Sequence, residues 1–197
     1  MKRLAILGGT TGIGSKLVEE AAKEYDIKIY GRPEYNIFVQ KTMMVLGRVL
    51  QRTRPEVFIL NANGPIIPGK DQYAYSQTET LKTLWPFIKE LDLTLVIMSS
   101  SGAWWAAEPV DPVLKLFRHS KYRLSSTAMS LCWKQRDPEH IARTILFEPS
   151  TMNPVIAQKA KIPCLSIADA WKMIKLGIDT KLPFIRLGCQ GSNDHHE

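Results

Sequence analysis

The segment near the N-terminus, residues 4–22, constrains the fold more than any other part of this sequence. An apolar run, Leu4–Leu7, leads into Gly8, Gly12 and Gly14, and the apolar residues that follow recur at helical spacing. This pattern predicts a buried strand, a tight turn and an amphipathic helix. Glycines there let backbone N–H groups and the positive end of the helix face a pyrophosphate, so the segment indicates a nucleotide-binding unit. The alternative interpretation is a loop that merely needs small residues.

Length and composition favour one globular α/β domain covering residues 1–197. The chain is 45% hydrophobic and 23% charged, and no run approaches the roughly 18 apolar residues that a membrane span requires. The first residues enter a strand directly and do not resemble a cleaved leader, so we expect a cytoplasmic location. Three scattered cysteines predict neither a disulfide framework nor a zinc site, and we assign no metal.

The formal net charge is +7, and the basic residues are unevenly placed. Residues 41–54 contain four basic side chains and residues 113–136 contain six, with no acidic residue in either segment. This excess suggests an anionic partner, although solvated helix faces would give the same pattern. Aromatic residues do not interleave with the basic ones and no RNA- or DNA-binding motif is present, so we expect nucleic acid to be an unlikely partner.

Residues 26–32 predict a second strand that ends at Gly31-Arg32. The end of this strand in a nucleotide-binding sheet lies beside the adenosine ribose, where an arginine favours a 2′-phosphate. Arg32 therefore indicates NADP(H) in preference to NAD(H), with a surface arginine in a turn as the alternative. Residues 36–39 predict a short third strand, and residues 43–50 form an amphipathic helix.

The middle of the chain predicts two more strands with polar residues at their ends. Residues 56–60 lead into Asn61-Ala62-Asn63-Gly64, where small and amide side chains would let a cofactor lie close to the backbone. Residues 76–79 form a candidate capping box for a helix over residues 80–91, which Pro86 should kink or divide. Residues 93–98 are the clearest buried strand, and serines follow at positions 99, 100 and 101.

The last third continues the alternation of helices and strands. Asp111-Pro112 should cap a helix that runs to about residue 136, and residues 143–148 predict the next strand. An irregular flap then reaches residue 165, before a helix over residues 166–178 and a last strand over residues 184–187. Taken together, these elements predict an α/β fold: a Rossmann-type doubly wound parallel sheet in three layers, α/β/α.

These motifs, in this order, resemble the short-chain dehydrogenase/reductase family over residues 2–191, and the chain is identified as a divergent, shortened member. Pro149-Ser150-Thr151 resembles the segment that lies beside the nicotinamide in that family. The resemblance implies an NADP(H) cofactor and, by analogy, a homodimer or homotetramer. It assigns cofactor contacts to Gly8, Thr10, Thr11, Gly12, Ile13, Gly14, Arg32, Asn61, Ala62, Asn63, Gly64, Pro149 and Thr151.

The resemblance also implies a chemistry in which hydride passes between a nicotinamide and a small carbonyl or alcohol. A tyrosine hydroxyl exchanges the proton, and this role falls on Tyr122. A serine orients the substrate oxygen; this role falls on Ser100, with Ser99 and Ser101 as alternatives. The family places a lysine four residues after the tyrosine, but Ser126 stands there and supplies no charge to favour the phenolate.

Two functions therefore remain open, and nucleic-acid binding through the basic helix faces is a third alternative with less support. The first is an NADP(H)-dependent oxidoreductase with an altered proton relay through Tyr122, Ser100 and Ser126. The second is a catalytically impaired NADP(H)-binding relative that regulates or binds another protein. The second function agrees with the loss of two family residues: the lysine, which Ser126 replaces, and the asparagine, which is missing between residues 65 and 98.

Overall fold

The computed structural model describes residues 1–104, 109–133, 142–150, 152 and 164–189. Within these residues the chain alternates between strands and helices, as predicted. Its elements in order are β1 (Lys2–Leu7), α1 (Gly12–Ala21), β2 (Tyr25–Tyr30), α2 (Gln40–Thr53), β3 (Val57–Leu60), α3 (Asp71–Ala74), α4 (Ser76–Ile88), β4 (Thr94–Met98), the 3₁₀ turn η1 (Ser101–Trp104), α5 (Pro112–Trp133), β5 (Arg143–Pro149), α7 (Ile167–Asp179) and β6 (Phe184–Cys189).

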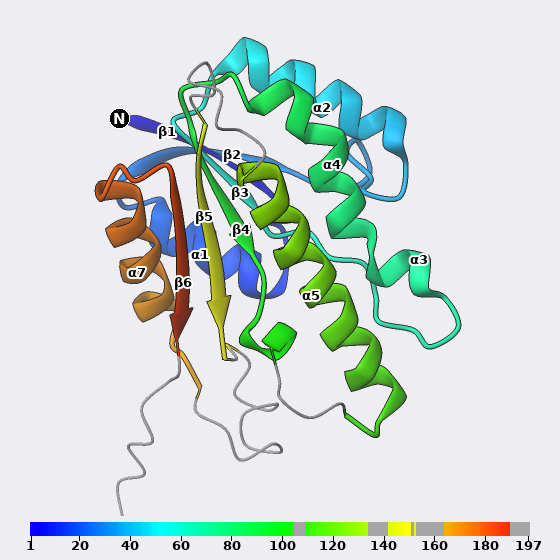
Figure 1. Ribbon diagram of the computed structural model, residues 1–197. Helices are drawn as coiled ribbons and strands as arrows, with labels where there is room; N and C mark the ends of the chain where they lie inside the picture. The colour runs from blue at the N-terminus through cyan, green and yellow to red at the C-terminus, as the bar shows by residue number, and fades with distance from the viewer. Residues whose placement is uncertain (105–108, 134–141, 151, 153–163, 190–197) are drawn as a thin grey trace, which may run out of the picture.

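The six strands form one parallel sheet in the order β2-β1-β3-β4-β5-β6. The strand order reverses between β1 and β3, because β2 pairs with one side of β1 and the chain then crosses over to place β3 on the other side of β1. Helices α2, α4 and α5 cover one face of the sheet, and α1 and α7 cover the other (Figure 1). The predicted Rossmann-type, three-layer fold is therefore confirmed.

Successive side chains of each strand pack alternately into two separate hydrophobic cores, one on each face of the sheet. On β1, Ala5 and Leu7 pack beneath α2, α4 and α5, whereas Leu4 and Ile6 pack against α1 and α7. Because successive side chains of a strand point to opposite faces, a strand between two helical layers must be apolar throughout. This is why the buried runs of β1, β3 and β4 predicted their strands well.

The structure corrects three local predictions. Residues 36–39 form turns instead of a strand, because the Asn36 side chain accepts the N–H of Phe38 at 3.1 Å and its carbonyl accepts that of Val39. The predicted capping box is also wrong: α4 begins at Ser76, whose hydroxyl donates to Tyr73 O at 2.7 Å. Pro86 lies in the last turn of α4 and does not divide it.

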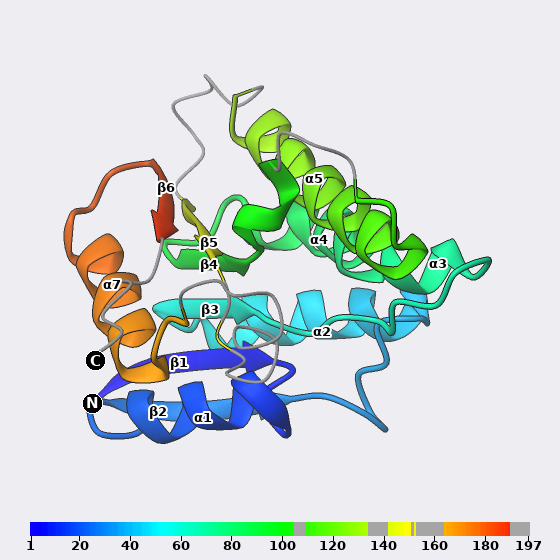
Figure 2. The same ribbon diagram turned by 90° about the horizontal axis from the view of Figure 1, so that it is seen from below.

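The carboxyl ends of all six strands meet at one edge of the sheet, since the strands are parallel. Figure 2 looks onto the lower end of the molecule, toward which the strand arrows of Figure 1 point. The predicted glycine turn, Arg32, the Asn61–Gly64 segment and the serines all follow strands at this edge. Ligands bind at this edge in open α/β sheets, at the point where the strand order reverses.

Candidate dinucleotide site

The turn after β1 needs glycine because the turn touches the segment that follows β3. Gly8 has a φ of +89°, its N–H donates to Tyr30 O at 2.9 Å, and a Cβ there would lie 2.7 Å from the backbone of Ala62. A Cβ on Gly14 would lie 1.9 Å from Gly8 O. No side chain fits at either position: Gly14 lets the helix pack against the turn, and Gly8 leaves bare backbone on the surface that a ligand would meet.

Asn61 joins the two loops that form this surface. Its side-chain amide donates to Gly8 O at 2.8 Å, and its own N–H donates to Leu7 O at 3.0 Å. Helix α1 starts at Gly12, and the side chain of its N-cap residue, Thr11, makes no capping hydrogen bond. The first N–H groups of α1 thus keep their hydrogen-bonding capacity for an anion, which the helix dipole also favours.

A cavity of about 880 Å³ lies along these loops. It is large enough for a cofactor, since ligand pockets span about 300–1,000 Å³. Aromatic residues that the sequence analysis did not predict form part of its wall, among them Tyr35, Phe38 and Tyr73, the last two in edge-to-face contact. The predicted residues that line this cavity are Gly8, Thr10, Thr11, Ile13, Arg32, Asn61, Ala62, Asn63 and Gly64.

The residues that line the cavity fit the phosphates of a dinucleotide. Gly8 presents bare backbone to the cavity, and Arg32 is an exposed cation just after β2, on the same cavity as Thr10 and Thr11. Gly12 and Gly14 shape the turn but do not line the cavity. A pyrophosphate would meet free N–H groups there, and a further phosphate would meet a guanidinium.

Lys121 is the functional candidate that the sequence analysis missed. This residue of α5 is 7% exposed, and its ammonium donates to Asn63 Oδ1 at 2.7 Å and to Gln77 Oε1 at 2.9 Å. Burial lowers the pKa of Lys121 to about 7. Through Asn63, the amine is one hydrogen bond away from the cavity. The sequence does contain a pattern that indicates burial of Lys121, because this residue lies at helical spacing from Leu124 and Ala128, which are buried on the apolar stripe of α5.

Gln77 occupies the buried space between α4 and the sheet. Its amide nitrogen donates to the carbonyls of Leu60 at 3.1 Å and Met98 at 3.0 Å, so it joins the ends of β3 and β4. Its oxygen therefore points at Lys121 in a fixed orientation. The sequence analysis found no asparagine on this helix, but a glutamine of α4 does reach the site.

Tyr122 and Ser126 lie on a different side of α5 from Lys121. Successive helix residues are rotated by about 100°, so a tyrosine directly after an inward-facing lysine points elsewhere. Tyr122 is 51% exposed, contacts Trp104 edge-to-face at 5.3 Å, and lines an outer hollow together with Ser126 and Lys82. Neither Tyr122 nor Ser126 lines the dinucleotide cavity. The structure thus does not bring these two predicted residues together with the cofactor residues.

The serines after β4 point in two directions. Ser100 Oγ accepts the N–H of Gly102 at 3.2 Å and lies 3.5 Å from Pro149 O, so Ser100 and Pro149 are neighbours at the ends of β4 and β5. Ser99 instead faces α5, with its Oγ 2.8 Å from that of Ser125. Thr151, the remaining predicted contact, lies outside the described residues.

Ser99 belongs to a buried polar chain that ends at a carboxylate. Glu148 of β5 is 1% exposed and accepts hydrogen bonds from Ser125 Oγ at 2.6 Å and Trp104 Nε1 at 2.8 Å, and it pairs with Arg186 at 2.5 Å. An ionised carboxylate only accepts, so Ser125 must donate to Glu148. The proton of Ser99 then goes to Ser125, which leaves the Ser99 oxygen as an acceptor.

No family model matches the sequence, and neither does any curated protein. Solved structures do share the fold. One is a short-chain dehydrogenase from Burkholderia cenocepacia in complex with NADP, with a TM-score of 0.72 and 15% identity over 95% of this chain and 89% of that one. Another is a 3-alpha-hydroxysteroid dehydrogenase from Pseudomonas complexed with NADH, with a TM-score of 0.72 and 13% identity over 98% and 97% of the two chains.

A third structure, dTDP-4-dehydrorhamnose reductase from Bacillus anthracis in complex with NADP, gives a TM-score of 0.71 at 18% identity, over 98% of this chain and 76% of that one. The chain therefore has the fold that the motifs predicted. The first two matches extend over nearly the full length of both chains. Among the described residues no helix is long and apolar enough to cross a membrane.

Proposed function

We propose that this chain, which has the fold of the short-chain dehydrogenases, binds NADP(H) in preference to NAD(H) and is an oxidoreductase for a small carbonyl or alcohol. The observation that carries the proposal is the cavity at the carboxyl edge of the sheet. It unites the glycine turn, Arg32 and the Asn61–Gly64 segment, which come from three separate parts of the sequence. The comparison structures that hold NADP or NADH support a nicotinamide dinucleotide as the occupant.

The binding role divides among these residues by their chemistry. The N–H groups at the start of α1, beside Gly8, donate to the bridging phosphates, and the guanidinium of Arg32 selects the additional phosphate of NADP(H). Asn63 lines the cavity, and its side-chain oxygen accepts a hydrogen bond from Lys121. In the family that the motifs resemble, a lysine binds the cofactor ribose. We propose Lys121 of α5 as the counterpart of this lysine.

The bound nicotinamide would supply or accept a hydride at the substrate carbon. The protein must then exchange a proton with the substrate oxygen, and we propose Ser100 as the hydroxyl that orients this oxygen. Tyr122 remains a candidate for the proton donor by its resemblance to the family's tyrosine. Lys121 is the second candidate, because a pKa of about 7 allows its amine both to give and to take a proton near neutral pH.

One observation favours the alternative function, an impaired NADP(H)-binding protein with a regulatory or protein-interaction role. Tyr122 is exposed on the outer side of α5, and Phe117, one turn before the inward-facing Lys121, has no hydroxyl. If Lys121 is the counterpart of the family's lysine, the position of the acid/base tyrosine is occupied by Phe117. The chain would then bind the cofactor in the same cavity and turn over slowly or not at all.

A two-step experiment separates these functions. The first step titrates NADPH and NADH into the protein and follows tryptophan fluorescence, with Arg32→Ala as the test variant and Arg48→Ala, on the exposed side of α2, as the matched control. We expect Arg32→Ala to weaken NADPH binding by about tenfold and leave NADH binding unchanged, since one charge-assisted phosphate contact is lost. No affinity for either coenzyme would overturn the proposal.

The second step follows NADPH oxidation with a panel of aldehydes, ketones and quinones. Turnover that Lys121→Met abolishes and Tyr122→Phe leaves intact identifies the amine as the essential group. The reverse result identifies the phenol. Binding without turnover by any of the three proteins supports the impaired relative.

A further inference from the structure

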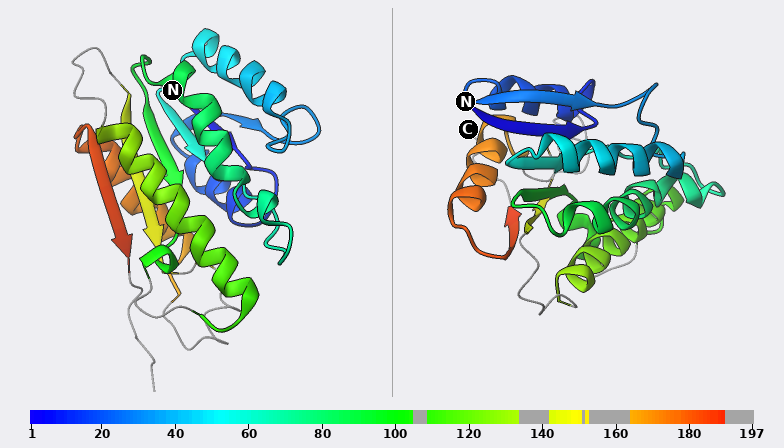
Figure 3. Two further views of the ribbon diagram at one scale, coloured as in Figure 1. Left: turned by 45° about the vertical axis from the view of Figure 1, so that its right-hand side comes forward. Right: turned by 90° about the horizontal axis from the view of Figure 1, so that it is seen from above.

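In the part of the chain that the structure describes, β2 is an edge strand of the sheet and pairs with β1 alone (Figure 3). The N–H and C=O groups of a strand residue point to one side, and this side alternates along the strand. Tyr30 O accepts from Gly8 N, so Tyr30 faces β1. It follows that Tyr25, Ile27 and Ile29 direct their backbone groups away from the sheet. An edge of this kind is a template for another strand.

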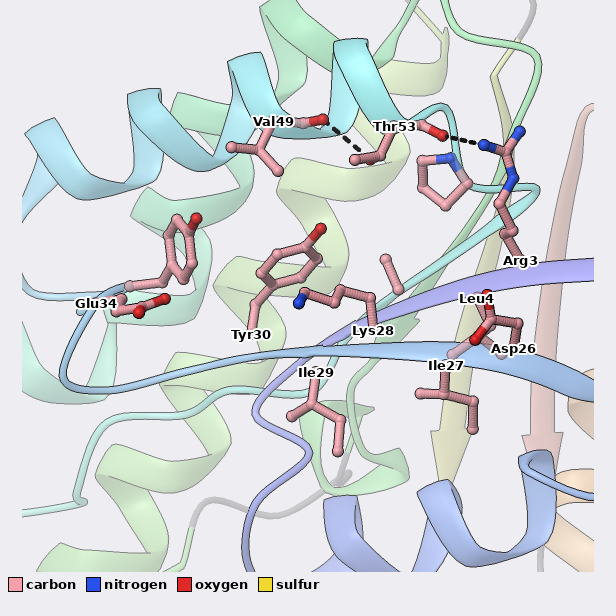
Figure 4. Close-up of a pocket in the computed structure, with 13 residues that line it drawn as sticks. Arg3, Leu4, Asp26, Ile27, Lys28, Ile29, Tyr30, Glu34, Val49 and Thr53 are labelled. Atoms are coloured by element: carbon pink, nitrogen blue, oxygen red, sulfur yellow. Dashed lines mark hydrogen bonds between the residues drawn. The ribbon is translucent and has the colours of Figure 1, made fainter.

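The side chains along β2 are divided into a charged face and an apolar face. Lys28 and Tyr30 point toward α2, whereas Ile27 and Ile29 point toward α1 (Figure 4). Asp26 and Lys28 line a hollow of about 460 Å³ between β2 and α2, and neither makes an ion pair with another described residue. On the other face, Ile29 is 40% exposed. Along β2 the edge thus offers the cation of Lys28, the anion of Asp26 and an apolar strip that includes the exposed Ile29.

We propose that β2 is the interface of a homodimer, in which the β2 strands of two copies pair antiparallel about a twofold axis at Ile27. In this register, Ile27 lies opposite the partner's Ile27 and Tyr25 lies opposite the partner's Ile29. All of these residues have outward-facing backbone groups, so each of the three opposed pairs can exchange two hydrogen bonds. The two sheets become one continuous sheet, and neither copy keeps β2 as an open edge.

The same register places opposite charges together. Asp26 lies opposite the partner's Lys28, and Lys28 lies opposite the partner's Asp26, both at non-hydrogen-bonded positions where side chains come closest. The hollow beside α2 leaves room for these side chains. On the apolar face, Ile27 and Ile29 gain apolar neighbours from the partner.

The neighbouring pairing registers are unfavourable because they bring like charges together. A shift that keeps the outward-facing backbone groups opposed must move the pairing by two residues. One such shift places Asp26 opposite the partner's Asp26, and the other places Lys28 opposite the partner's Lys28. Like charges directly opposite each other are destabilising. The sequence of β2 is therefore self-complementary in the central register, which is why we assign the edge to a second copy and not to an unrelated peptide.

Sedimentation equilibrium of the purified chain across a concentration series tests the proposal. Lys28→Asp converts both charge pairs into repulsions, and we expect it to weaken dimerisation by about tenfold or more. The double variant Asp26→Lys/Lys28→Asp exchanges the two charges and restores both pairs, so it should dimerise like the natural chain. Arg48→Asp changes the net charge equally on α2 and should have no effect. Circular dichroism confirms that the variants fold, as expected for exposed positions.

Amide hydrogen exchange locates the interface independently of the association constant. In the dimer, the N–H groups of Ile27 and Ile29 should exchange slowly although they lie at a sheet edge, and Lys28→Asp should accelerate both. The inference is overturned if the chain is monomeric at all concentrations, or if a dimer leaves these two amides unprotected. It is also overturned if the charge exchange fails to rescue Lys28→Asp, which would indicate another surface or another partner. None of these outcomes depends on cofactor binding.

Discussion

The buried amine of Lys121 should make the stability of this protein depend on pH in a way that one substitution removes. Both hydrogen-bond partners of Lys121, Asn63 and Gln77, are neutral amides. Burial is thus not offset by a carboxylate, and the pKa falls from 10.5 to about 7. Each pKa unit corresponds to about 1.4 kcal/mol, so the protonated amine lowers the free energy of unfolding by up to about 5 kcal/mol below pH 7.

The sign of the effect follows from proton counting. Between pH 7 and 10.5 the unfolded chain holds the proton of Lys121 and the folded chain does not. Stability therefore rises with pH in this window, by up to about 1.4 kcal/mol per unit and by about 2 kcal/mol between pH 7 and pH 9, because half of the folded chains still hold the proton at pH 7. In Lys121→Met, which has a side chain of similar length and no charge, this rise should be absent.

The assay is urea denaturation of both proteins at a series of pH values. Other groups whose pKa is raised by burial, such as Cys132 and Tyr30, titrate in both proteins and cancel in the difference. The expected result is a difference in the free energy of unfolding that changes by about 2 kcal/mol from pH 7 to pH 9. A pH-independent difference would show that Lys121 stays protonated in the folded state, and would refute the proposal that its amine both gives and takes a proton near neutral pH.

Three further substitutions test the packing of the site. Gly14→Ala places a methyl group 1.9 Å from Gly8 O and should cost about 3 kcal/mol in urea denaturation and abolish NADPH binding, whereas Gly188→Ala, whose Cβ meets open space, should do neither. Asn61→Ala removes the hydrogen bond to Gly8 O and should cost about 1 kcal/mol; a larger loss of NADPH affinity than of stability would show that Asn61 shapes the turn for the ligand. Glu148→Gln keeps an acceptor for Trp104 but removes the charge that pairs with Arg186, so we expect a loss of about 2 kcal/mol at pH 7. An unchanged unfolding midpoint would mean that the ion pair with Arg186 contributes little to stability.

Several features of the site could be predicted because they are local in the sequence. The apolar run before Gly8 and the spacing of the glycines predicted the strand, the turn and the helix that the structure contains. Arg32 and the Asn61–Gly64 segment were predicted because they directly follow predicted strands, and a parallel sheet brings such ends to one edge. One prediction was wrong because a local turn competes with strand formation. The side chain and carbonyl of Asn36 accept hydrogen bonds that hold a turn where a strand was expected.

The sequence by itself determined the alternation of strands and helices, the glycine turn and the presence of a cation near the end of β2, because periodicity and turn chemistry act over a few residues. Only the tertiary structure decided which side of α5 faces the sheet. A rotation of one residue separates Lys121 from Tyr122, and packing against Gln77 and Asn63 turns the lysine inward. Tertiary structure likewise left β2 as an edge strand, because which strands become neighbours depends on the whole sheet and not on any one segment.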